Sequence, residues 1–360
     1  MTEGSETSDA SACMCFIDMS KMSAPRAPLS VGLYDFDRAC LDRVVTRHHD
    51  RRGERAVRRA RRARWGQPCG YPRRRGSLPG YNPDVVTRNQ IDACAAFRAL
   101  HESGCFVIPN PWDVGTAIAL HQQGFKALAS TSAGLAFTYG LADSAPLEGL
   151  LSHLRAIVAA TPLPVNADFQ WGFANDLEGL AENVTRCVAT GVAGLSIEDA
   201  TGDPAAPLFG RDASIERIRT ARAAIDRSGI PVVLTARCEA WLVGDPDAER
   251  IALDRCVAFA AEGADCVFAP RLPPDKIPAF VRAVAPTAVN VVVTGPDPRL
   301  TVAALAEVGV RRISVGATLA RVAWGAFLDA ARSIAETGSF EALATAAPFA
   351  TLSGIFDKRD

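Results

Sequence analysis

The sequence lacks the features that define membrane, secreted and zinc-binding proteins. No apolar run approaches the ~20 residues that a membrane-spanning helix needs, and no basic segment followed by an apolar one opens the chain, so we expect no secretory signal. The ten cysteines include no CxxC pair. Six of them lie within apolar helix or strand patterns, namely Cys94, Cys105, Cys187, Cys238, Cys256 and Cys266. This distribution is typical of buried thiols in a reducing compartment, so it predicts a cytoplasmic protein without a disulfide framework or a zinc site.

Charge is unevenly distributed along the chain. Residues 1–90 contain 17 Lys and Arg against 10 Asp and Glu, whereas the remainder has 22 against 30. A mildly acidic body argues against nucleic acid as the main ligand. The stretch 43–75 holds 13 arginines and little that could bury a core, so we predict a disordered, Arg-rich extension over residues 1–90. A tail for anionic surfaces and a targeting segment are the alternatives for these arginines.

The pattern over residues 91–360 predicts an α/β protein, a (β/α)₈ TIM barrel with a C-terminal helical extension. Short apolar runs rich in β-branched residues alternate there with longer amphipathic stretches, which are mostly closed by glycine. The predicted strands are Cys105–Pro109, Ala127–Ser132, Val165–Phe169, Gly194–Glu198, Val232–Arg237, Cys266–Pro270, Asn290–Thr294 and Ile313–Gly316. A doubly wound open sheet is the alternative, but it would usually carry a Gly-rich turn after its first strand, and residues 109–112 are not such a turn.

In a barrel, the reactive groups lie at the carboxyl ends of the strands. Asp168, Glu198 and Arg237 end three consecutive predicted strands. Carboxylate oxygens are the ligands that Mg²⁺ prefers, and an arginine offers a planar, bidentate partner to a carboxylate or phosphonate. Asp199 precedes a loop rich in Gly and Pro and is read instead as a structural residue that caps a helix or pairs with an arginine. The five histidines are expected at the surface, with none serving as a catalytic base.

Six segments of the chain, in order, resemble the isocitrate lyase/phosphoenolpyruvate mutase superfamily. Residues 164–173 among them are similar to the branch of that superfamily that has NADF in the third strand of its barrel. The six segments cover most of residues 95–355 and are PNPWDVGTAIAL (109–120), STSAGLAFTYGLADS (130–144), PVNADFQWGF (164–173), GLSIEDATGD (194–203), TARCEAWLVG (235–244) and RRISVGATLARVAWGAF (311–327).

The resemblance implies a Mg²⁺-dependent lyase or hydrolase. Its substrate would be a small α-oxo or α-hydroxy carboxylate, whose C–C or P–C bond breaks or forms through an enolate. The metal ligands implied are Asp168, Glu198, Asn166 and Asp143, and the substrate-binding residues are Ser132, Ala133, Gly134, Leu135 and Arg237. Asn290, read from the start of a predicted strand, is a further substrate-binding candidate. Family members exchange a C-terminal helix between subunits, which implies a homodimer or homotetramer.

Two departures from the family pattern bear on the reaction. Asn166 stands where the family has an aspartate, which removes one charge from the metal site. The segment 199–212 contains no Cys, Lys or His, whereas isocitrate and methylisocitrate lyases carry an acid/base cysteine there. We therefore expect Tyr139, Glu239 or water to supply the proton, with Arg237 as the third catalytic residue.

Two other functions stay open. A catalytically degraded barrel that binds a small carboxylate fits Asn166 and the altered loop. A phosphate-binding aldolase or isomerase fits the glycine turns at 293–298 and 314–320, but no lysine ends a strand to form a Schiff base.

Overall fold

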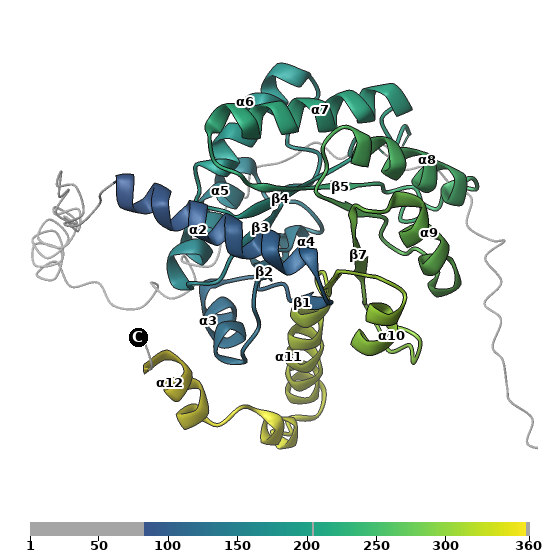
Figure 1. The fold of residues 1–360 in the computed structure, drawn as a ribbon. Helices are drawn as coiled ribbons and strands as arrows, with labels where there is room; N and C mark the ends of the chain where they lie inside the picture. The colour runs from purple at the N-terminus through teal and green to yellow at the C-terminus, as the bar shows by residue number, and fades with distance from the viewer. Residues whose placement is uncertain (1–82, 204, 358–360) are drawn as a thin grey trace, which may run out of the picture. The chain divides into compact units, whose positions relative to one another are not determined.

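The computed structural model describes residues 83–203 and 205–357. The prediction of a disordered extension therefore falls almost wholly outside the described residues. Within them, eight parallel strands form one sheet in the order β1-β8-β7-β6-β5-β4-β3-β2 (Figure 1). The strands are β1 (Phe106–Ile108), β2 (Leu128–Ala129), β3 (Val165–Asp168), β4 (Gly194–Glu198), β5 (Val233–Arg237), β6 (Cys266–Phe268), β7 (Ala288–Val292) and β8 (Arg312–Ser314). The predicted (β/α)₈ barrel is confirmed.

The sheet closes on itself between its first and second strands. β1 and β2 form no ladder, but the backbone N–H of Ala129 donates to the carbonyl of Pro109 at 3.0 Å. Across the rest of the ladder, Glu198 stands opposite Arg237 and Asp168 opposite Ser196. The register therefore brings polar side chains of β3, β4 and β5 to the same end of the barrel.

Helices connect successive strands, and their amphipathic faces cover the sheet. They are α2 (Pro83–Glu102), α3 (Val114–Gln122), α4 (Ser132–Thr138), α5 (Leu147–Ala160), α6 (Leu177–Val188), α7 (Arg211–Ser228), α8 (Ala248–Ala261), α9 (Ile277–Val284), α10 (Val302–Glu307), α11 (Thr318–Thr337) and α12 (Phe349–Asp357). Gly229 closes α7 in a left-handed conformation, as the glycine pattern predicted. Among the described helices, none combines the length and apolarity that a membrane crossing would require.

Every strand except β4 differs from its predicted bounds by one to three residues, and two boundary differences change where a residue lies. Helix α2 begins at Pro83, before the predicted boundary at residue 91, and Gln90 in it is buried and donates to the carbonyls of Val188 and Val192. Strand β7 begins at Ala288 instead of Asn290, because pairing with β6 starts at that residue. Asn290 is therefore the middle residue of the strand instead of its first.

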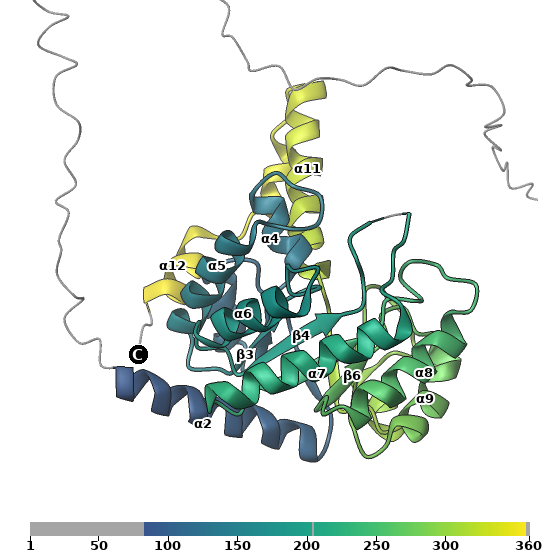
Figure 2. The same cartoon turned by 90° about the horizontal axis from the view of Figure 1, so that it is seen from above.

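The C-terminal helices confirm the predicted extension. Helix α11 leads away from the barrel (Figure 2). Helix α12 returns beside α3, where Gln122 donates to the carbonyl of Ile355. Large apolar side chains on this segment are exposed, including Val322 (66%), Phe327 (59%) and Phe349 (86%). Elsewhere apolar side chains are mostly buried, and the six described cysteines are free thiols, five of them buried.

Candidate active site

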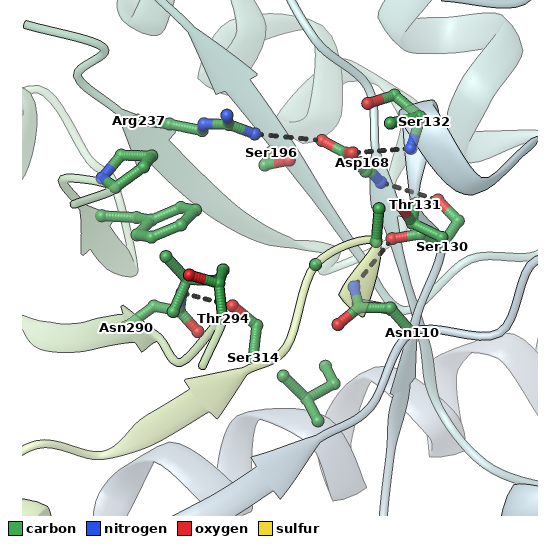
Figure 3. A pocket seen from close by; sticks show the side chains of 18 of the residues that line it. Asn110, Ser130, Thr131, Ser132, Asp168, Ser196, Arg237, Asn290, Thr294 and Ser314 are labelled. Atoms are coloured by element: carbon green, nitrogen blue, oxygen red, sulfur yellow. Dashed lines mark hydrogen bonds and ion pairs between the residues drawn. The ribbon is translucent and has the colours of Figure 1, made fainter. Parts of the chain in front are cut away.

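A cavity of about 460 Å³ opens at the carboxyl ends of the strands. Residues from β1, β2, β3, β4, β5, β6, β7 and β8 or the turns after them contribute to its wall. Figure 3 shows the polar part of that wall, which includes Asn110, Ser130, Thr131, Ser132, Asp168, Ser196, Arg237, Asn290, Thr294 and Ser314. The cavity is thus where a barrel is expected to place a ligand.

Arg237, at the end of β5, stands among three carboxylates. Its Nε and Nη2 donate to Glu239, the latter at 3.1 Å. Its Nη1 lies 3.4 Å from Asp168 Oδ1 and 3.3 Å from Glu198 Oε2. Asp168 and Glu198 therefore contact one nitrogen atom, and the structure brings the three predicted strand-end residues together.

The charges of this cluster are out of balance, with three carboxylates around one guanidinium. Burial raises the pKa of Glu198 well above its usual range, against the attraction of Arg237, and the neighbouring Glu239 and Asp168 add to the rise. Burial likewise raises the pKa of Glu239. Burial alone would lower the pKa of Arg237, but the surrounding carboxylates outweigh it and raise that pKa. A further positive charge at the cluster would relieve the repulsion.

Asp168 is held by the turn after β2. The backbone N–H of Ser132 donates to Asp168 Oδ2 at 2.8 Å, and the backbone N–H of Asp168 donates to Ser130 Oγ at 2.9 Å (Figure 3). With Arg237 on its other oxygen, the carboxylate is constrained from two sides. Such support gives a side chain a defined direction into a cavity.

The donor set fits a hard divalent cation. Asn166 Oδ1 is buried without a hydrogen-bond partner in the described residues, and Asn166 lines the cavity together with Asp168 and Asp143. Among the described residues no three His, Cys, Asp or Glu side chains converge as metal ligands. Mg²⁺ does not require such a cage, because it keeps several waters and commonly takes only one or two carboxylates from the protein.

A second polar group lies across the cavity on β7 and β8. Asn290 Nδ2 donates to Ser314 Oγ at 3.0 Å, and Arg312 Nε donates to Asn290 Oδ1 at 2.9 Å. Arg312 also donates to Thr235 Oγ1 at 2.9 Å and lies 3.3 Å from His101 Nε2. The expectation of surface histidines is wrong for His101 and His153, which are both half-buried. His101 packs against the buried Arg312, and His153 Nε2 is buried without a hydrogen-bond partner among the described residues.

Five predicted site residues do not line the cavity. One is the predicted metal ligand Glu198, whose carboxylate is buried beside Arg237. Tyr139 is 51% exposed and lies against Gly149 of α5, so close that a Cβ at that glycine would be 2.7 Å from the tyrosine hydroxyl. Glu239 is only 2% exposed and lies on the far side of Arg237. Gly134 and Leu135 are buried in α4, whereas Ser132 and Ala133 line the cavity beside them.

The altered segment after β4 is held by a buried ion pair. Asp199 accepts from Arg255 at 2.6 Å and from the backbone N–H of Glu239 at 2.7 Å, and its side chain is 1% exposed. Arg255 also donates to the carbonyl of Phe209 at 2.8 Å. The interpretation of Asp199 as an arginine-paired structural residue agrees with these contacts, and the pair fixes the backbone that carries Glu239.

Sequence reasoning missed several residues of the cavity. Asn110 links three strands, because it donates to the carbonyl of Ser130 and accepts from the backbone N–H of Val315. Arg312 and Arg321 line the cavity although neither follows a predicted strand end. Their signal was their place inside family-like segments, with Asn110 in the first and Arg312 and Arg321 in the sixth.

Comparison with known proteins agrees with the fold and the site. The family model of phosphoenolpyruvate phosphomutase matches residues 97–335. A solved structure from Burkholderia cenocepacia, provisionally described as a lyase or mutase, is 43% identical, covers 76% of this chain and 98% of its own, and has a TM-score of 0.72. The chain therefore belongs to the isocitrate lyase/phosphoenolpyruvate mutase superfamily.

Two relatives with named activities are more distant. The 2-methylisocitrate lyase of Salmonella typhimurium is 30% identical over 48% of this chain and 60% of its own length. The structure of oxaloacetate acetylhydrolase with its product oxalate is 25% identical, covers 74% of this chain and 94% of its own, and has a TM-score of 0.65. An uncharacterised protein of Mycobacterium tuberculosis is 30% identical over 71% of this chain and 94% of its own length. Named superfamily relatives act as lyases, hydrolases or mutases on small oxo-carboxylates, which supports an enzyme of this kind.

Proposed function

We propose that the protein is a Mg²⁺-dependent lyase or hydrolase of a small 2-oxo or 2-hydroxy carboxylate. The observation that carries the proposal is the cluster of Asp168, Glu198 and Glu239 around Arg237. Asp168 and Arg237 line the strand-end cavity, and the two glutamates lie buried behind them. The cluster's surplus of negative charge favours a divalent cation, and its guanidinium favours a carboxylate. The two relatives with named activities act on 2-methylisocitrate and oxaloacetate, which are acids of this class.

Asp168, Glu198 and Asn166 Oδ1 would hold the cation, with Asp143 at the edge of the cavity. When bound, Mg²⁺ polarises a carbonyl oxygen and stabilises the negative charge that develops on an enolate. Glu239 accepts hydrogen bonds from Nε and Nη2 of Arg237. The remaining nitrogen of Arg237, Nη1, therefore faces the cavity. The contacts of Nη1 are 3.3 and 3.4 Å long, beyond the 2.7–2.9 Å of a strong charge-assisted bond, and this nitrogen is the donor available to a substrate carboxylate.

This chain differs from the lyases that carry an acid/base cysteine in the group that donates the proton. Tyr139 and Glu239 lie off the cavity wall, and no thiol, imidazole, amine or phenol is among its described lining residues. Hydroxyls of Ser130, Ser132 and Ser196 are present instead. We propose that a water held among these hydroxyls delivers the proton, since the cavity has room for solvent beside a small acid.

The test is turnover by the full chain. Oxaloacetate, methylated malates, 2-methylisocitrate and phosphonopyruvate are each supplied with Mg²⁺, and products are followed by NMR. We expect turnover of at least one acid, abolished by EDTA and reduced roughly 100-fold in Asp168→Asn, with Arg155→Ala on α5 as the control. Turnover that survives both EDTA and Asp168→Asn would refute the proposal. Mg²⁺-dependent oxalate binding without any turnover would favour the degraded, carboxylate-binding barrel.

We also propose that the chain forms a homodimer or homotetramer in the cytosol through α11 and the segment that follows it. The support is the row of exposed apolar side chains there, with Val322, Phe327, Leu328, Phe340 and Phe349 between 49% and 86% exposed. Patches of this kind mark association surfaces. Light scattering at micromolar concentration should give the mass of at least two chains, and a monomeric mass would contradict the proposal.

A further inference from the structure

Two arginines at the cavity have no partner of their own. Arg271, after β6, and Arg321, in the first turn of α11, both line the cavity and are exposed. Neither forms an ion pair or a side-chain hydrogen bond with any described residue. Arg237, in contrast, is surrounded by carboxylates. The cavity thus offers two guanidinium groups that are engaged within the protein, those of Arg237 and Arg312, and two that are free for a ligand.

The backbone of Arg271 adopts a conformation that is unfavourable for residues other than glycine. Its φ is +63°, in the left-handed region that is uncommon for residues other than glycine. The tight turn is closed by Leu272, whose backbone N–H donates to the carbonyl of Ala269 at 3.2 Å. Backbone strain that persists at a cavity wall points to a functional requirement for the side chain that is kept there.

The N-terminus of α11 adds positive potential to the wall of the same cavity. Gly316 and Ala317 line the cavity, and Ala317 is an N-cap residue without a side-chain hydrogen bond to the helix. The hydroxyl of Thr318, the first helical residue, is buried without a partner among the described residues. The N–H of Thr318 donates to the carbonyl of Val315 at 3.1 Å, but no side chain caps the turn, and the dipole of this 20-residue helix favours an anion.

We infer that Arg271, Arg321 and the start of α11 form a second oxyanion subsite, which selects acids with a carboxylate at each end. The inference rests on the proposed function, because the first carboxylate and the 2-oxo group would lie at Asp168 and Arg237. Phe268, Leu242 and Val292 line the cavity as well and provide apolar surface for the carbons between the two ends. The preferred ligands are then 2-oxo dicarboxylates of about four to six carbons, in preference to 2-oxo monocarboxylates.

Calorimetry of the full chain with Mg²⁺ separates the two sites. Pyruvate probes the first site alone, and oxaloacetate and 2-oxoglutarate probe both. We expect wild-type protein to bind at least one of the diacids about tenfold or more tightly than pyruvate. The double variant Arg271→Gly/Arg321→Ala should lose that preference and keep its affinity for pyruvate, whereas Arg155→Ala should behave as wild type.

The single variant Arg271→Gly tests whether misfolding, and not the loss of the arginine, explains a weaker affinity for the diacid. Because glycine accepts a positive φ freely, its Tm should equal or exceed that of wild type while its affinity for the diacid falls. An unchanged preference for the diacid in the double variant, with pyruvate still bound, would overturn the second subsite and leave the proposed function standing. If none of the three acids bound to wild type, both the subsite and the proposed 2-oxo acid site would be refuted.

Discussion

Acid should destabilise this protein through His101. The ring lies between two fixed partners, with Nδ1 2.8 Å from the carbonyl of Phe97 and Nε2 3.3 Å from Arg312 Nη1. A carbonyl only accepts and a guanidinium only donates, so Nδ1 must carry the hydrogen and Nε2 must be bare. The folded barrel therefore requires the neutral imidazole.

Burial, followed by the charge of Arg312, lowers the pKa of His101 from 6.5 to about 3. The unfolded chain then binds a proton that the folded chain excludes, so stability falls as the pH decreases from 6.5 toward 3. Across the whole range from the unfolded to the folded pKa, this loss of folding stability amounts to about 5 kcal/mol, at 1.36 kcal/mol per pKa unit. Between pH 7 and pH 5, the part expected is about 2 kcal/mol.

The measurement is the free energy of unfolding in urea at pH 8, 7 and 5, for wild type and His101→Gln. A glutamine can accept from Arg312 and donate to the carbonyl of Phe97, but it does not titrate. The variant should therefore lose about 2 kcal/mol less than wild type between pH 7 and pH 5, and pH 8 serves as the reference at which both are neutral. Equal losses in the two proteins, or an NMR titration of His101 near pH 6, would refute the reasoning. Because Arg312 lines the cavity, the same protonation would also disturb the polar group that includes Asn290.

Three further outcomes follow from the contacts. Asp199→Asn leaves Arg255 buried without its counter-ion, which should cost about 3–5 kcal/mol of stability and lower the Tm by roughly 10 °C. The control Asp329→Asn breaks an ion pair whose side chains are 60% and 73% exposed, so it should change the Tm by no more than about 3 °C. Equal shifts in the two variants would contradict this. Mg²⁺ at about 100 times its Kd should stabilise wild type by about 2.7 kcal/mol in thermal denaturation, and a shift that persists in Asp168→Asn would place the ion elsewhere. Tyr139→Phe should leave kcat within about twofold of wild type, because a general acid contributes ~10²–10⁴-fold and Tyr139 lies outside the cavity; a loss of that size would restore it as the proton donor.

The sequence alone was sufficient for the barrel and for the centre of the site. Short apolar runs closed by polar residues mark strands whatever the tertiary context, and the strand Gly194–Glu198 has the predicted bounds. The carboxyl ends of parallel strands in a closed barrel meet at one end. For that reason Asp168, Glu198 and Arg237, each the last residue of a strand, could be placed together from their positions in the chain.

Only the tertiary structure decided where the residues beyond the strand ends point. Glu239 follows Arg237 by two residues, yet it lies behind that arginine because the turn is fixed by Asp199 and Arg255, which come from distant segments. Arg271 directly follows a predicted strand, so its place at the strand ends is visible in the sequence, but the positive φ of its turn is not. A strand repeats its side-chain direction every second residue, so its end can be predicted from sequence, but a loop takes its direction from individual φ and ψ angles and from contacts that exist only once the barrel has closed.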